Sequence, residues 1–238
     1  MMFLQTLTPM KHSMKNNLFK KFSLKTLGLP VFNKDFLLSY NNLPIDLIND
    51  DGFPIRSRRY ANYIIEKDNF QNNLNIFYTG KNKFLQDVDD SRKEERIFPL
   101  IEEKFISDDF LLRFMTHCCS LDNLKDNNCY DISLHQVRQI CYPNVESHNS
   151  PEGIHKDGAD YIVSALVMNR YNINGGESIV YDDDNKNKNK NKIYNTILEK
   201  GEGIFQDDKR LWHYVTPITT DNNYIGIRDI IGLDIKIS

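Results

Sequence analysis

Three residues in the second half of the chain could bind a metal ion together. His155 and Asp157 are two positions apart, and His213 follows much later in the chain. If the first pair lies on extended backbone, its imidazole and carboxylate point to the same side, because alternate residues of a strand share a face. Two imidazoles and one carboxylate would leave three coordination positions open to other ligands.

This donor set is that of the facial triad in non-haem Fe(II) oxygenases. The spacing alone is weak evidence, and the alternative is a surface charge pair with His213 as a hydrogen-bonded core histidine. Arg228, beyond His213 in Gly226-Ile227-Arg228-Asp229, favours the iron site. A 2-oxoglutarate cosubstrate that chelates iron at one end needs a bidentate donor for its far carboxylate, and arginine supplies one. Otherwise Arg228 would be a surface or structural residue paired with Asp229.

The elements that must position these side chains are strands. From about residue 130, short apolar runs rich in β-branched and aromatic residues alternate with turn signals, and no crossover helix separates them. This pattern predicts an antiparallel sandwich or barrel. The expected strands are 135–142, 161–171, 178–181, 201–206, 211–215 and 224–237.

The first half of the chain has a different character. Residues 1–34 contain six lysines and no acidic residue, which suggests a poorly ordered lead-in. Helical and mixed patterns occupy 35–130. They predict one helix over 97–105, with Pro99 in its first turn, and a second helix that begins after Asp108.

Two charged segments of the sequence are predicted to be solvent-exposed and to have no part in the chemistry. The basic run 55–60, with Arg56, Arg58 and Arg59, predicts a solvated, salt-bridged face. The segment 182–192 repeats Asp, Lys and Asn, and its low complexity predicts an exposed hairpin loop.

Composition excludes several classes of protein. Thirty Lys+Arg against thirty-three Asp+Glu give a net charge of -3, so we expect no nucleic-acid or membrane-surface partner. No stretch approaches the length of a membrane helix. Four cysteines in 238 residues form no disulfide framework, so a reduced, cytoplasmic protein is expected.

Several ordered motifs carry a resemblance to a known family. The chain resembles the 2-oxoglutarate/Fe(II)-dependent dioxygenases, and more narrowly the bacterial group that includes free L-isoleucine hydroxylases. The similarity spans roughly residues 50–235, and the 182–192 segment and the lead-in depart from it. The matching segments are Arg58-Arg59-Tyr60, His135-Gln136-Val137-Arg138, 151–158, 175–178, 207–218 and 226–229.

The resemblance implies a mainly β fold, a distorted double-stranded β-helix of the jelly-roll type with a helical N-terminal layer. It implies one dioxygenase domain over 35–238, with its β-helix core at 131–238. It also implies Fe(II), 2-oxoglutarate and O2, with ascorbate as a reductant. The implied metal ligands are His155, Asp157 and His213, and Arg228 would hold the cosubstrate.

The implied reaction hydroxylates an aliphatic C–H bond of a small molecule, a free L-amino acid above all, and releases succinate and CO2. Arg138 and Gln136 are candidate substrate residues. They alternate with His135 and Val137, so only one of these two pairs should face the pocket. The alternatives are a related dioxygenase acting on a protein side chain or another metabolite, and a catalytically silent β-barrel that binds a ligand.

Overall fold

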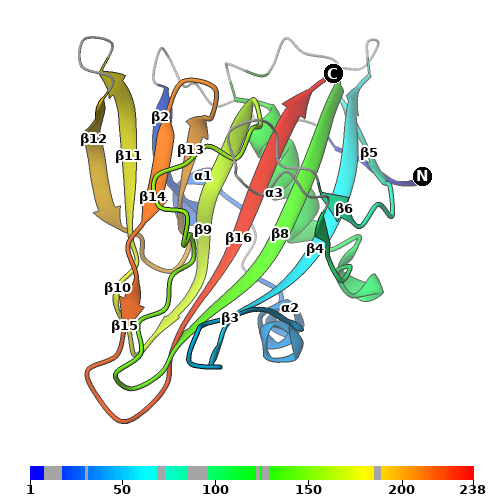
Figure 1. The fold of residues 1–238 in the computed structure, drawn as a ribbon. Helices are drawn as coiled ribbons and strands as arrows, with labels where there is room; N and C mark the ends of the chain where they lie inside the picture. The colour runs from blue at the N-terminus through cyan, green and yellow to red at the C-terminus, as the bar shows by residue number, and fades with distance from the viewer. Residues whose placement is uncertain are drawn as a thin grey trace.

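The fold is built on one long, twisted antiparallel sheet (Figure 1). The computed structural model describes residues 1–7, 18–29, 32–68, 73–84, 96–121, 124, 129–184 and 189–238. Within these residues the sheet has nine strands, in the order β1-β5-β4-β8-β16-β9-β13-β2, and β3 pairs with β4. The strands are β1 Met2–Leu7, β2 Phe19–Ser23, β3 Ile45–Ile48, β4 Pro54–Lys67, β5 Leu74–Tyr78, β8 Cys129–Cys141, β9 Tyr161–Tyr171, β13 Glu202–Asp207 and β16 Gly226–Ile237.

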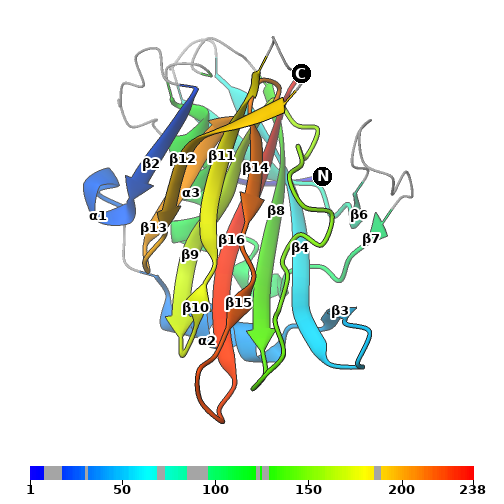
Figure 2. The same cartoon turned by 60° about the vertical axis from the view of Figure 1, so that its left-hand side comes forward.

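A shorter sheet lies in front of the long one (Figure 2). It consists of β12 Asn189–Ile197, β11 Glu177–Asp184 and β14 Trp212–Val215, and the pair β10 Asn174–Gly175 and β15 Ile218–Thr219 continues the same layer below. Apolar side chains from both sheets pack between the layers. This two-sheet arrangement is the expected double-stranded β-helix.

The two faces of the long sheet bury different partners. Because side chains alternate along a strand, one set on β4, β8 and β16 faces the short sheet and the other faces the helices. The helix-facing set joins a large apolar core with α3 Asp109–Cys119, α2 Lys34–Ser39 and α1 Leu24–Leu27. As expected, α3 begins after Asp108, whose side chain accepts a hydrogen bond from the Leu111 amide. No helix in the described part of the chain could cross a membrane.

Several N-terminal expectations were wrong. The lead-in supplies β1, β2 and α1, with residues 8–17 and 30–31 outside the described part. The helix expected over 97–105 is replaced by β7 Arg96–Ile97, which pairs with β6 Lys83–Phe84, and by extended chain and a short 3-10 turn, Glu103–Phe105. There Pro99 offers its carbonyl to the Tyr60 amide, so contact with β4 overrides the helical spacing. A second 3-10 turn, Tyr40–Asn42, follows α2.

The polar segment 182–192 is a hairpin, as expected, but more of it is strand than loop. Asp182, Asp183 and Asp184 pair with Asn191, Lys190 and Asn189 as the ends of β11 and β12. Residues 185–188 lie outside the described part of the chain. Backbone pairing therefore extends the strands although the composition offers nothing apolar to bury.

Candidate metal centre and cosubstrate site

The chain that joins β8 to β9 brings the two histidines together. This connection runs alongside β15 and β14, with Ser147 paired to Ile218 and His155 paired to His213. The His155 amide donates to the His213 carbonyl at 3.0 Å, and the His213 amide donates to the His155 carbonyl at 3.0 Å. The connection thus acts as an irregular edge strand, and it places residues 58 positions apart side by side.

The three candidate ligands converge at one point. One ligand atom from each of His155, Asp157 and His213 lies within 4.8 Å of the others. His155 Nε2 is 3.6 Å from Asp157 Oδ1, and His213 Nε2 is 3.4 Å from Asp157 Oδ2. The Nδ1 of His155 lies 2.8 Å from the Gly153 carbonyl, which can only accept, so Nδ1 carries a proton, and in the neutral ring Nε2 is the nitrogen that can bind a metal. The geometry suits a small divalent cation bound through both Nε2 atoms and the carboxylate.

The electrostatics of this cluster favour a bound cation. Burial lowers the pKa of His155, but Asp157, Glu152 and the Gly153 carbonyl outweigh it and raise that pKa to about 9. Burial opposes ionisation of Asp157 as well, yet the two histidines hold its pKa below the usual range. Burial and the neighbouring His155 lower the pKa of His213 to about 4. One imidazole is thus held neutral, while positive charge is stabilised at the other.

Asp208 fixes the loop that carries the ligands, and the sequence analysis did not identify this role. One oxygen of its buried carboxylate accepts from the amides of Gly158 and Ala159, at 2.8 and 3.1 Å. Its other oxygen lies 4.0 Å from His213 Nδ1. Asp208 precedes the strand that carries His213, so its hydrogen bonds hold the backbone just after Asp157 against the start of that strand. The only sequence signal was its place in the motif 207–218.

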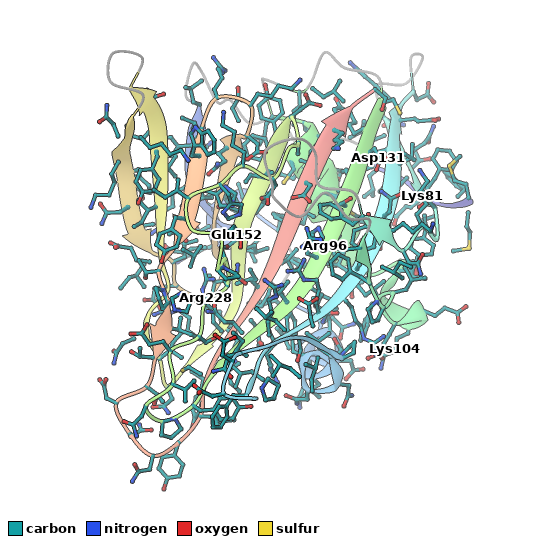
Figure 3. The ribbon with its side chains drawn as sticks, viewed as in Figure 1. Lys81, Arg96, Lys104, Asp131, Glu152 and Arg228 are labelled. Atoms are coloured by element: carbon teal, nitrogen blue, oxygen red, sulfur yellow. The ribbon has the colours of Figure 1, made fainter. Side chains whose placement is uncertain are left out.

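Arg228 is a buried cation, and no carboxylate of the described residues forms an ion pair with it. Its side chain is 1% exposed, and none of its three guanidinium nitrogens has a hydrogen-bond partner in the described part of the chain. The alternative that paired it with Asp229 is wrong, because Asp229 faces the helices and binds Arg138 at 2.6 and 2.8 Å. Figure 3 places Arg228 below Glu152, toward the end of the barrel where β10 and β15 pair.

A second arginine strengthens this site. Arg170 on β9 pairs in register with Arg228, and its Nη1 is also buried without a hydrogen-bond partner. Burial and then Arg170 lower the pKa of Arg228 to about 10. Gly176 lines the same space with φ +66, and a Cβ there would lie 3.3 Å from Arg228 Cδ. Two adjacent guanidinium groups beside a glycine form a cradle for an anion, and a carboxylate of 2-oxoglutarate fits this chemistry.

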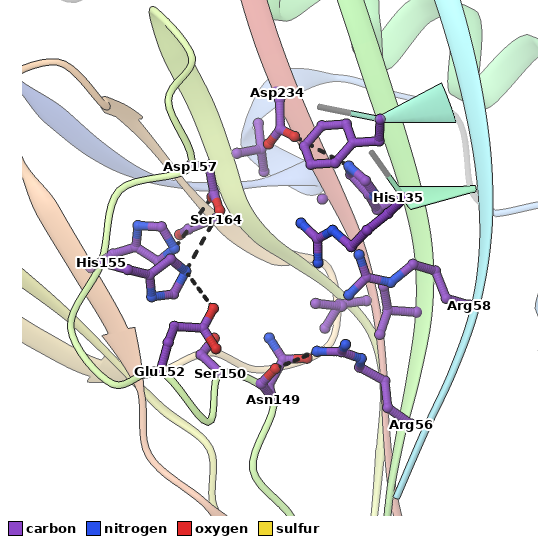
Figure 4. Close-up of a pocket in the computed structure, with 17 residues that line it drawn as sticks. Arg56, Arg58, His135, Asn149, Ser150, Glu152, His155, Asp157, Ser164 and Asp234 are labelled. Atoms are coloured by element: carbon purple, nitrogen blue, oxygen red, sulfur yellow. Dashed lines mark hydrogen bonds and ion pairs between the residues drawn. The ribbon is translucent and has the colours of Figure 1, made fainter. Parts of the chain in front are cut away.

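A cavity of about 630 Å³, open to solvent, adjoins the candidate metal ligands (Figure 4). His135 and Val137 line it, so they are the pair of this motif that faces the pocket. Gln136 and Arg138 face the helical layer, where Gln136 donates to Ser39 on α2 and Arg138 binds Asp229. The alternation along β8 therefore places the two candidate substrate residues on the wrong face for contact with substrate.

The basic run 55–60 is not a solvated face. It forms part of β4, and Arg56 and Arg58 point into the cavity from the wall opposite His155 (Figure 4). Arg59 points the other way and donates to the Leu100 carbonyl at 2.8 Å. The expectation was wrong because β4 lies inside the long sheet between β5 and β8, so neither of its faces is fully open to solvent.

Lys190, from the polar hairpin, contacts the loop that carries His155. Its Nζ lies 3.4 Å from the centre of the Trp212 ring and donates to the Ile154 carbonyl at 3.3 Å. Lys156 approaches the same ring, at 4.8 Å. Lys190 thus joins β12, the metal-binding loop and the start of β14 through a cation–π contact and one hydrogen bond.

We expect Lys190→Ala to loosen this loop. The lost contacts are worth about 0.5–2 kcal/mol, which predicts faster amide hydrogen exchange at residues 154–156 by about twofold to thirtyfold. Lys192→Ala is the matched control, because Lys192 is exposed on the same strand. Equal exchange in both variants would show that Lys190 does not restrain the loop.

The chain is similar to known proteins in sequence and in fold. A family model described as 2OG-Fe dioxygenase matches residues 38–234. No curated protein sequence matches the chain. The crystal structure of a bsmA homolog from Methylobium petroleophilum PM1 superposes with a TM-score of 0.76 at 20% identity, covering 94% of this chain and 90% of the other.

Two further crystal structures share the fold. IDO from Bacillus thuringiensis superposes with a TM-score of 0.69 at 22% identity, covering 93% of this chain and 94% of the other. The Fe(II)/(alpha)ketoglutarate-dependent dioxygenase TqaL gives a TM-score of 0.59 at 13% identity, with 93% and 83% covered. At these identities the superpositions establish the fold.

Proposed function

Because the chain belongs to the 2OG-Fe dioxygenase family, we propose that it hydroxylates an aliphatic C–H bond of a free L-amino acid. Besides the substrate, this family requires Fe(II) as its metal cofactor and 2-oxoglutarate and O2 as cosubstrates. One oxygen atom enters the substrate as a hydroxyl group, and the other enters succinate as CO2 leaves. The observation that carries the proposal is the convergence of His155, Asp157 and His213 beside a cavity that opens to solvent.

Separate groups of residues would bind the metal, orient its ligands and bind the cosubstrate. His155 Nε2, His213 Nε2 and Asp157 would hold the iron, which would activate O2 as the oxidant when it is bound. The Gly153 carbonyl orients the His155 ring, and Asp208 holds the backbone that follows Asp157. The buried guanidinium of Arg228, with Arg170 beside it, would hold the far carboxylate of 2-oxoglutarate.

The cavity accounts for the choice of a small substrate. It opens to solvent beside the candidate metal ligands, and charged, polar and apolar side chains line it. Cationic side chains lie on one wall, and Glu152 lies on the other, 3.6 Å from His155 Nε2. A zwitterion offers both charges that such walls would pair. The resemblance to the free L-isoleucine hydroxylases supports the same substrate class.

The test is succinate formation from 2-oxoglutarate, measured with a panel of free L-amino acids, with and without Fe(II). We expect at least one aliphatic amino acid to stimulate succinate formation and to gain one oxygen atom by mass spectrometry. No stimulation by any amino acid would overturn the proposed substrate class. A hydroxylated product from a peptide or another metabolite in the same assay would point to the related dioxygenases instead.

A further inference from the structure

Arg58 is a buried cation that the roles described so far leave without a function. It lies on β4, its side chain is 12% exposed, and it lines the cavity opposite the candidate metal ligands. The guanidinium carbon of Arg58 lies 4.9 Å from the centre of the Phe98 ring. Phe98 belongs to an aromatic cluster with Tyr60 and Phe84. This packing holds the planar group in one orientation at the cavity wall.

The charge of Arg58 is poorly compensated. Arg56 and Arg58 share one carboxylate, that of Asp46, at 2.6 and 3.3 Å. Arg56 also donates to the Asn149 carbonyl at 2.6 Å, whereas the buried Nε of Arg58 has only the 3.3 Å approach to Asp46, which lacks hydrogen-bond geometry. Across the sheet, Asp234 is engaged by His135 at 3.2 Å. A buried cation that shares its carboxylate with a second arginine is only partly compensated, so an anionic ligand at this wall would be favourable.

Burial, and then the neighbouring Arg56, lower the pKa of Arg58 to about 9. At neutral pH this group is still charged, and a bound anion would raise the pKa again.

The site at Arg58 is separate from the cradle at Arg228. Arg56, Gln139 and Arg228 form one row across three neighbouring strands, and Arg58, Val137 and Ile230 form the next. Arg58 and Arg228 are thus two strands and one row apart, at least about 10 Å between backbones. Two carboxylates could be held at once, one by each arginine.

The cavity lining includes a small group of apolar side chains besides its charged and polar ones. Val137, Val163 and Ile230 line the cavity, together with Gly232. A ligand anchored by a carboxylate at Arg58 would lay its carbon chain across these side chains toward His155 and Asp157. The arrangement favours an aliphatic carboxylate whose C–H bonds point at the metal.

We infer that Arg58 is the specificity-determining residue that binds the carboxylate of an aliphatic substrate in the cavity facing the metal ligands. This inference rests on the proposed function and deepens it, because it names the group that the substrate must carry. The bidentate fork of arginine suits a planar carboxylate, and a neutral amide of the same shape would leave the guanidinium unpaired.

The test compares carboxylates with their amides on the anaerobic enzyme loaded with Fe(II) and 2-oxoglutarate. The probes are L-leucine against L-leucinamide and 4-methylpentanoate against 4-methylpentanamide, with binding measured by calorimetry. In the wild type we expect a carboxylate to bind at least about 30-fold more tightly than its amide. In Arg58→Gln this preference should disappear, while the absorbance of the Fe(II)–2-oxoglutarate chelate should titrate as in the wild type.

Arg59→Gln is the matched control, because Arg59 is the next residue of the strand and points away from the cavity, toward the Leu100 carbonyl. It should keep the preference for carboxylates. Arg58→Lys keeps a charge without the fork, and it should show a preference between those of the wild type and Arg58→Gln. This variant also decides the matter if Arg58→Gln does not fold.

Two results would overturn the inference: no carboxylate binds better than its amide to the wild type, or both Arg58 variants keep the full preference. The proposed function fails in a different way. Carboxylates that bind through Arg58, with no amino acid hydroxylated, would leave the inference standing and remove the amino-acid substrate. Hydroxylation of amino acids without any preference for carboxylates over amides would support the proposed function and overturn the role of Arg58.

Discussion

Asp157→Ala is expected to abolish Fe(II) binding and turnover while the barrel stays folded. The substitution removes the carboxylate that lies within 3.6 Å of both histidine Nε2 atoms. Replacement of residues that only support a metal ligand typically costs 10–100-fold, so loss of a ligand itself should cost more than about 100-fold. The measurements are succinate formation and Fe(II) affinity under anaerobic conditions.

A thermal readout separates metal loss from misfolding. A bound metal stabilises the folded state by mass action, so Fe(II) should raise the Tm of the wild type and leave that of Asp157→Ala unchanged. His213→Ala should behave in the same way. His148→Ala is the control, because that side chain is 44% exposed and pairs with Glu146 outside the cluster. Wild-type succinate production by Asp157→Ala would refute the assignment of the metal site.

Arg228→Ala is expected to weaken 2-oxoglutarate binding far more than Fe(II) binding. It removes a buried guanidinium and would leave the carboxylate with Arg170 as its remaining cation, at a cost of about 2–5 kcal/mol. This corresponds to a dissociation constant raised by about 30-fold to 5,000-fold. The absorbance of the anaerobic Fe(II)–2-oxoglutarate chelate, titrated with 2-oxoglutarate, gives the constant directly.

Two further variants sharpen this test. Arg228→Lys keeps a charge but loses the planar fork, so its dissociation constant should lie between those of the wild type and Arg228→Ala. Arg113→Ala removes an arginine that is exposed on α3 and paired with Asp109, and it should bind 2-oxoglutarate as the wild type does. If Arg228→Ala binds 2-oxoglutarate with unchanged affinity, the cosubstrate site lies elsewhere.

Local signals in the sequence predicted most elements of the β half, because strand periodicity and turns are short-range features. The strand expected at 161–171 is β9, and the one expected at 224–237 is β16 within two residues. The helix after Asp108 follows from its capping residue. The helix over 97–105 failed because backbone contact with β4 decides that segment, and no local pattern reports such a contact.

The sequence by itself determined the types of group available: two histidines and an aspartate at suggestive spacing, an arginine beyond them, and a β-rich second half. It could not determine which side of a strand each residue faces relative to the cavity, because alternation divides residues into two sets without saying which set is inside. Only the tertiary structure placed Arg138 among the helices and Arg58 in the cavity. It did so through the position of β4 and β8 in the sheet, where burial of the apolar set against the helices directs the other set toward the candidate metal centre.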